Sequence, residues 1–177
     1  FPTRRSYDVP TANKTLDVDA PNYVLTTLPI PLAEKGFYVF PVNTTRYVLE
    51  QVGYYEGERI HQMPPQELSK LFEEDAILYV TIKRWDAQYI VLSTQVTVEF
   101  EYRLVGREGV EFWRETKRLV YTPQNNSGGG LIGALINAAL TRAAPNYMPL
   151  ARQANYQAFY GPQAFPDGPY KERSEKK

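Results

Sequence analysis

The sequence has 177 residues, of which 43% are hydrophobic, and this is the size and composition of one domain with a substantial core. Its 20 Lys and Arg residues balance its 20 Asp and Glu residues, so no net charge attracts an anionic surface, and we expect no nucleic-acid partner. Cysteine is absent, which excludes disulfide bonds and thiolate ligands for a metal.

The first predicted element is a helix that begins near residue 20. Asp19 and Pro21 favour this start, because an acidic side chain suits the positive end of a helix and proline fits its first turn. The residue before a proline is pushed toward extended geometry. We therefore expect the helix to end before Pro29 and Pro31.

A strand, two helices and a second strand are expected next. The aromatic and β-branched run at residues 36–42 predicts a buried strand. A helix capped by Asn43 should follow and end at Gly53, and a short amphipathic helix should begin at Pro64. Residues 76–85 are almost continuously apolar, which is typical of a strand buried on both faces.

The clearest pattern in the sequence predicts a long hairpin. Residues 96–104 alternate strictly between apolar and polar, as in a strand with one face in water. The glycines at residues 106–109 should turn the chain into a returning strand. The apolar residues of the first, alternating strand are Val96, Val98, Phe100, Tyr102 and Leu104. Acidic residues of the first strand could pair across the hairpin with Arg114, Lys117 and Arg118, although the register is open.

Two helices are expected to finish the domain, at residues 131–142 and 147–159, before Gly161 and Pro162 end regular structure. We predict one domain over residues 1–162 and an extended or disordered tail over residues 163–177. The early alternation of strands and helices favours parallel neighbours, and the hairpin adds antiparallel ones. The predicted fold is α/β (α+β mixed), a central mixed sheet with helices packed on its faces.

Residues 127–140 read SGGGLIGALINAAL and allow several interpretations. Gly128 and Gly133 have the spacing of a phosphate-binding loop, but Ala134 and Leu135 replace the required Lys and Ser/Thr, so nucleotide binding is disfavoured. The apolar run is also shorter than the roughly 20 residues that span a bilayer. A packed helix fits best, either in the core or at a contact between two copies of the chain. The residues expected at such a contact are Gly129, Gly133, Leu131, Ile132, Leu135 and Ile136.

The polar residues predict no catalytic, cofactor or metal site, and no enzymatic activity. His61 is the only histidine, and its single Glu-x-x-His pair with Glu58 falls short of the two pairs that a di-metal bundle needs. We expect His61 to lie in a loop. Tyrosine rings could stack on sugars or bases, and the candidates are Tyr54, Tyr55 and Tyr89.

Several segments, taken in order and spacing, resemble one bacterial family. They are VPTANKT, PLAEKGFYVFPV, QELSKLFEEDAILYVTIKRW and GGGLIGALINAAL, followed by a late FYGP. The family is that of Gram-negative outer-membrane lipoproteins which includes a meningococcal vaccine-antigen candidate. More distantly, the P-x-x-N-x-T motif and the strand-helix-strand core are similar to CsgG-like proteins and to the N-terminal domain of TolB.

The resemblance implies a lipid-anchored domain on the periplasmic side, or the surface, of the outer membrane, with a role in envelope assembly, secretion or transport. It also implies a homodimer and envelope protein partners. The membrane would be contacted only through an N-terminal lipid anchor, and because the sequence begins at Phe1 we expect that segment to have been removed. The family has no known catalytic residues, so none is assigned. The alternative hypothesis is a ligand-binding module whose exposed tyrosines hold a glycan or peptidoglycan.

Overall fold

The computed structural model describes residues 5–90, 93–121 and 147–171. These residues form a mixed six-stranded sheet in the order β3-β1-β4-β5-β6, with β2 paired to β4 off that path. β1 runs parallel to β3 and β4, whereas β4, β5 and β6 are antiparallel. The predicted α/β fold with a mixed sheet and a long hairpin is confirmed. The strands are β1 (Arg5–Asp8), β2 (Ala12–Asn13), β3 (Tyr38–Val39), β4 (Ala76–Ile90), β5 (Ser93–Gly106) and β6 (Glu111–Tyr121).

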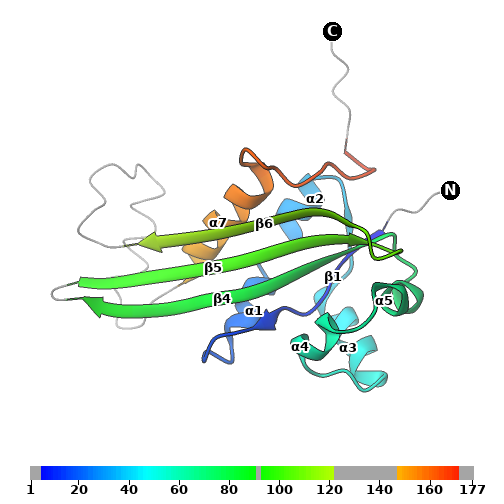
Figure 1. Ribbon diagram of the computed structural model, residues 1–177, viewed down its shortest axis with the longest axis horizontal. Coiled ribbons are helices and arrows are strands. Elements are labelled where there is room, and N and C mark those ends of the chain that lie inside the picture. The colour runs from blue at the N-terminus through cyan, green and yellow to red at the C-terminus, as the bar shows by residue number, and fades with distance from the viewer. Residues whose placement is uncertain (1–4, 91–92, 122–146, 172–177) are drawn as a thin grey trace, which may run out of the picture.

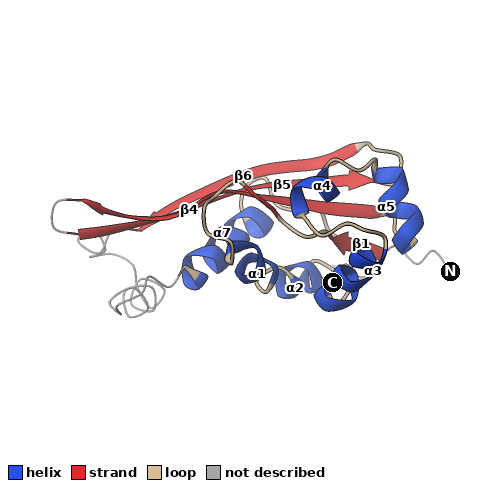
Figure 2. Ribbon diagram, turned by 90° about the horizontal axis from the view of Figure 1, so that it is seen from below, coloured by secondary structure: helices blue, strands red, loops and turns tan. Residues whose placement is uncertain are grey.

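The helices lie in two groups (Figures 1 and 2). Helices α1 (Ala20–Leu25), α2 (Pro29–Glu34) and α7 (Met148–Tyr160) cover one face of the sheet, here called the inner face. Helices α3 (Val42–Gln51), α4 (Gly57–His61) and α5 (Pro65–Phe72) gather at the end where β4 begins and pack on Ile77, Tyr79 and Val105 of the opposite, outer face. Among the helices that the structure describes, none has the length and apolar character needed to cross a membrane.

The alternating apolar and polar side chains of β5 lie on opposite faces of the sheet, as predicted. The side chains of Val96, Val98, Phe100, Tyr102 and Leu104 are all buried on the inner face, and the intervening charged residues point outward. β5 pairs with β4 from Ala76↔Gly106 to Ile90↔Ser93, with a bulge between Ile82 and Arg84. It pairs with β6 from Val96↔Tyr121 to Val105↔Glu111.

A buried chain of hydrogen bonds ties the sheet to its inner helices. The Tyr102 hydroxyl donates to Asn155 Oδ1 at 2.6 Å, and Asn155 Nδ2 donates to Thr27 Oγ1 at 2.6 Å. Thr27 in turn donates to the carbonyl oxygen of Val24. Because Asn155 is 1% exposed, these bonds satisfy polar groups that have no access to water.

The first helix ends before Pro29 as expected, because α1 ends at Leu25, but two other assignments need correction and one helix was not predicted. The unpredicted helix is α2, which begins at Pro29, because proline in a first turn removes no hydrogen bond that the helix needs. Asn43 is not the cap of α3, which begins one residue earlier, after Pro41. The strand expected at residues 36–42 is reduced to the two residues of β3.

The core continues past residue 162. Phe165 is 1% exposed, stacks on Phe159 at a centroid distance of 4.6 Å and meets the edge of Trp113 at 4.8 Å. The backbone beyond it returns to the end of α2, where the Gly168 amide donates to the carbonyl oxygen of Lys35 at 2.7 Å. Residues 163–171 therefore have no helix or strand but still contribute to the packed domain.

Candidate functional site

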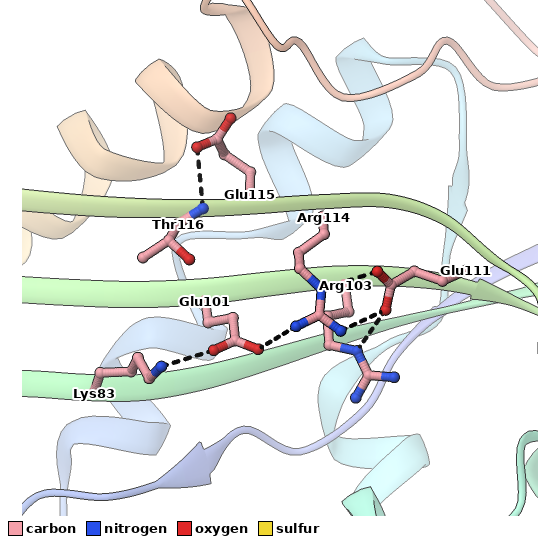
Figure 3. A network of polar contacts seen from close by, with 7 residues as sticks. All are labelled: Lys83, Glu101, Arg103, Glu111, Arg114, Glu115 and Thr116. Carbon is pink, nitrogen blue, oxygen red and sulfur yellow. Dashed lines mark hydrogen bonds and ion pairs between the residues drawn. The ribbon is translucent and has the colours of Figure 1, made fainter.

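The outer face of the hairpin carries a network of ion pairs, here called the charged face (Figure 3). Glu101 accepts from Lys83 Nζ at 2.9 Å and from Arg114 Nη1 at 3.3 Å. Glu111 is bound by Arg114 Nη2 at 2.8 Å and by Arg103 Nε at 2.9 Å. The contact between Glu101 and Arg114 confirms one predicted pairing of β5 with β6. The whole network consists of Lys83, Arg84, Glu99, Glu101, Arg103, Glu111, Arg114 and Arg118.

Glu99 organises the other end of the charged face. Its carboxylate lies 3.5 Å from Arg84 Nε and 3.9 Å from Arg118 Nε, so the predicted pairing of Arg118 is also confirmed. Lys117 differs from the expectation, because its ammonium lies 3.4 Å from Glu115 of its own strand. Lys117 and Glu115 alternate with the outward residues of β6, which places them on the opposite side of the strand.

These contacts hold the carboxylates of the charged face in their ionised form. Hydrogen bonds from Arg114 and Arg103 lower the pKa of Glu111 to about 2. A hydrogen bond from Lys83 lowers the pKa of Glu101 below its usual range. A general base works best with a pKa near the operating pH, so these two carboxylates are poorly suited to proton transfer at neutral pH. The arrangement instead gives a surface with ordered charges.

Exposed apolar side chains precede and follow the arginines along β6. Phe112 is 63% exposed and Val120 is 46% exposed. Phe112 lies over Gly106, where a Cβ would stand 2.5 Å from the Phe112 ring. β6 is also an edge strand of the described sheet, and the backbone amide of Thr116 donates to the Glu115 carboxylate at 3.0 Å. β6 thus carries exposed apolar contact points along the same strand as fixed positive charges.

A groove with a volume of about 790 Å³ lies between α1 and the helices α3 and α4. Its floor includes Thr11, Leu49 and Ile60, which are all buried. Tyr54 and Tyr55 line it, and Tyr55 is 72% exposed. The structure therefore brings two of the predicted tyrosines together at a concave site.

Close backbone packing and two buried hydroxyl groups characterise the bottom of the groove. A Cβ on Gly57 would lie 2.2 Å from the carbonyl oxygen of Thr11, so only glycine lets α4 approach the backbone of Thr11 this closely. The hydroxyls of Thr11 and Thr45 are buried and have no hydrogen-bond partner within the described residues. A buried hydroxyl without a partner is costly, so these groups are placed to accept or donate a bond to a bound molecule or water.

The P-x-x-N-x-T motif shapes the loop beside the groove. Asn13 Oδ1 accepts from the amide of Thr15 at 3.0 Å and from its hydroxyl at 2.8 Å, and Asn13 Nδ2 donates to the carbonyl oxygen of Asp17 at 2.7 Å. These bonds close a tight loop between β2 and α1. The loop leaves Leu16 fully exposed and Val18 82% exposed, and Val18 lines the groove.

Two titratable side chains, the half-buried His61 and the buried Glu74, lie near α4 and α5. His61 ends α4 rather than lying in a loop, and its ring meets the edge of Tyr79 at 5.1 Å, with Nε2 3.2 Å from the Pro10 carbonyl oxygen. Burial lowers the pKa of His61 to about 4. Burial also raises the pKa of Glu74 to about 9, while Arg107 donates to the Glu74 carbonyl oxygen instead of its carboxyl group. His61 does not line the groove.

The predicted self-association helix lies outside the described residues. This applies to Gly129, Gly133, Leu131, Ile132, Leu135 and Ile136, and the side chain of Tyr89 is not described either. Within the described ranges, no cluster of three or more His, Asp or Glu side chains could hold a metal ion. Sequence reasoning missed Thr11, Thr45 and Gly57, which no motif marks. It could have found Phe112, because this residue falls on the polar side of an alternating strand.

Comparison with known proteins identifies a lipoprotein family. The family model GNA1162-like, which describes lipoproteins, matches residues 6–158. The chain is 33% identical over 153 residues to lipoprotein NMB1124/NMB1162 of Neisseria meningitidis serogroup B, a match that covers 86% of this chain and 71% of that protein. The crystal structure of lipoprotein GNA1162 from Neisseria meningitidis aligns with a TM-score of 0.67 at 33% identity, covering 77% of this chain and 95% of that chain.

More distant structures share the fold. The PelC dodecamer from Paraburkholderia phytofirmans aligns with a TM-score of 0.52 at 15% identity, over 92% of this chain and 89% of that chain in one crystal form. Protein CT253 from Chlamydia trachomatis gives a TM-score of 0.52 at 10% identity, over 88% of this chain and 92% of that chain. The family assignment rests on the family model and the meningococcal relative, both of which span most of the chain. The chain therefore belongs to the GNA1162-like family of lipoproteins.

Proposed function

We propose that this chain is the non-catalytic periplasmic domain of a lipoprotein anchored in the Gram-negative outer membrane. In this proposal it binds protein partners during envelope assembly or transport. Family membership supports the lipid anchor. The observation that carries the protein-binding role is the charged face, with exposed Phe112 and Val120 before and after Arg114 and Arg118 along β6. Aromatic and arginine side chains are enriched at protein interfaces and among their energetic hot spots.

The charges on this face also favour a particular partner. Five of the eight side chains in the network are basic (Lys83, Arg84, Arg103, Arg114 and Arg118) and three are acidic. A partner surface with an acidic excess would complement this face, and such complementarity speeds association and selects among partners.

We also propose that the chain forms a homodimer. Edge strands such as β6 expose backbone groups that can pair with a strand of another chain. The bond from the Thr116 amide to Glu115 would have to open for this pairing. The dodecameric PelC structures support the view that this fold can self-associate. Light scattering over a wide concentration range tests the proposal, and a monomeric mass at every concentration would reject it.

Site-specific photo-crosslinking in cells tests the partner-binding role. A photoreactive residue replaces Phe112 in the full-length, lipidated protein, and a matched variant carries it at Tyr47, an exposed residue of α3 far from β6 in sequence. We expect discrete adducts of higher mass from position 112 and none from position 47. The adducts should weaken when Arg114 and Arg118 are replaced by Glu. Equal adducts from both positions, or none from position 112, would contradict the proposal.

A further inference from the structure

We infer that the groove between α1 and helices α3 and α4 binds an uncharged oligosaccharide that carries acetamido groups. The inference rests on the lining of the groove and does not depend on the protein-binding face. The volume of about 790 Å³ falls in the range of about 300–1,000 Å³ that is usual for ligand pockets.

The tyrosines match the two-sided character of a sugar ring. Tyr54 is half-buried and Tyr55 is exposed, and both line the groove. A tyrosine offers an apolar ring and a hydroxyl at one place. A sugar likewise has an apolar face of C–H bonds and a rim of hydroxyl groups. Val18 extends the apolar rim on the side of the β2–α1 loop.

Neutral polar groups supply the hydrogen bonds that a sugar requires. Asn22 of α1 and Asn43 of α3 are exposed on the two walls, and neither side chain has a hydrogen bond within the described part of the chain. A side-chain amide can donate and accept at the same site. The buried hydroxyls of Thr11 and Thr45 lie at the bottom without partners among the described residues.

The apolar floor favours an acetamido sugar over a plain one. Leu49 and Ile60 are 1% exposed and Leu25 is 8% exposed, so together they form an apolar base. The methyl of an acetamido group can contact this base, while its N–H and carbonyl groups can bond to the surrounding hydroxyls and amides. Burial of that methyl adds affinity through the hydrophobic effect.

The charges at the groove disfavour an ionic ligand. Arg46 Nε binds Glu50 at 2.9 Å, and Glu58 accepts from the Asn13 amide at 3.2 Å. Glu56 is the one lining charge without a side-chain contact in the described structure, and its negative charge would repel an anionic sugar. The groove therefore suits a neutral chain.

Isothermal titration of the full chain with a β-1,4-linked N-acetylglucosamine tetrasaccharide tests the inference. The glucose tetrasaccharide with the same linkage is the matched probe. We expect saturable binding of the acetylated sugar, with a Kd for the plain sugar about tenfold higher. Equal affinity for both sugars would overturn the acetamido assignment, and absence of binding at millimolar concentration would overturn the site itself.

Two variants locate the binding. Tyr55→Ala should raise the Kd about tenfold, since it removes a ring from the groove. Tyr47→Ala removes an exposed tyrosine of α3 that does not line the groove, and should leave the Kd unchanged. Both residues are exposed, so both variants should fold, and thermal unfolding checks this. Unchanged binding in Tyr55→Ala, or an equal loss in both variants, would overturn the inference.

Discussion

The two faces of β5 use alternate residues of one strand, but different forces act on them. On the inner face, Phe100 and Tyr102 are fully buried under α1, α2 and α7. On the outer face, Glu99 and Glu101 pair with basic side chains that remain partly exposed. Burial of apolar area stabilises a fold strongly, whereas an exposed ion pair contributes only about 0–1 kcal/mol. The inner face therefore holds the domain together, and the outer face is free to specify contacts.

Truncation of an inner-face side chain should give the largest effect. Phe100→Ala removes a fully buried ring and should lower the free energy of unfolding by about 3–5 kcal/mol. Arg118→Ala, on the outer face of β6, is the matched variant and should change it by no more than about 0.5 kcal/mol. Urea unfolding measures both. Similar losses in the two variants would show that the outer face is structural.

The buried hydrogen-bond chain should give the next largest effect. Asn155→Leu leaves the Tyr102 hydroxyl buried without its acceptor and should cost about 2–3 kcal/mol. Tyr102→Phe combined with Asn155→Leu removes both partners, and should recover at least about 1 kcal/mol of that loss. Thermal or urea unfolding of the single and double variants measures the coupling. A double variant less stable than Asn155→Leu alone would contradict this account.

A smaller effect, a dependence of stability on pH, is expected from Glu74, which is buried where helices cover part of the outer face. Burial raises the pKa of Glu74 to about 9 from 4.5, so the folded state keeps a proton that the unfolded state loses. Stability contributed by this proton is complete below pH 4.5 and is lost as pH rises toward 9. From pH 7 to pH 9 the free energy of unfolding should fall by about 2 kcal/mol, and Glu74→Gln should remove that slope.

The pH range of the measurement matters because His61 lowers stability as the pH falls, whereas Glu74 lowers stability as the pH rises. Its pKa is lowered from 6.5 to about 4, so it removes stability as pH falls from 6.5 to 4. Unfolding measurements above pH 7 therefore report on Glu74 alone of these two groups. If the wild type and Glu74→Gln show the same slope there, the carboxyl group is not buried as described.

The elements predicted correctly are those with strong local periodicity. β5 was predictable because its apolar and polar side chains alternate over many residues, and the buried face of such a strand must carry apolar side chains. α2 was not predictable, because prolines such as Pro29 and Pro31 can follow the end of a helix or lie in the first turn of one, and the sequence pattern does not distinguish these roles. The pairing of Glu99 with Arg118 needed the register, which only the folded hairpin specifies.

The groove could not be predicted from the sequence. Thr11 and Thr45 are separated in the sequence by two helices and two short strands, and their proximity depends on how α3 and α4 pack beside β2. Gly57 gives no local signal, since the contact that requires glycine is with the backbone of Thr11. Tyr54 and Tyr55 were predicted as candidates, but their place beside a cavity is a property of tertiary packing.

The position of Phe165 has a consequence for the order in which the domain can form. Chains are synthesised from the N-terminus, and the rings that surround this residue, Phe37, Trp113 and Phe159, are all made before it. Until Phe165 docks, those three rings face an unfilled space. Completion of the core is thus delayed until residue 165 has been made, and a nascent chain released before residue 165 would expose an aromatic surface prone to aggregation.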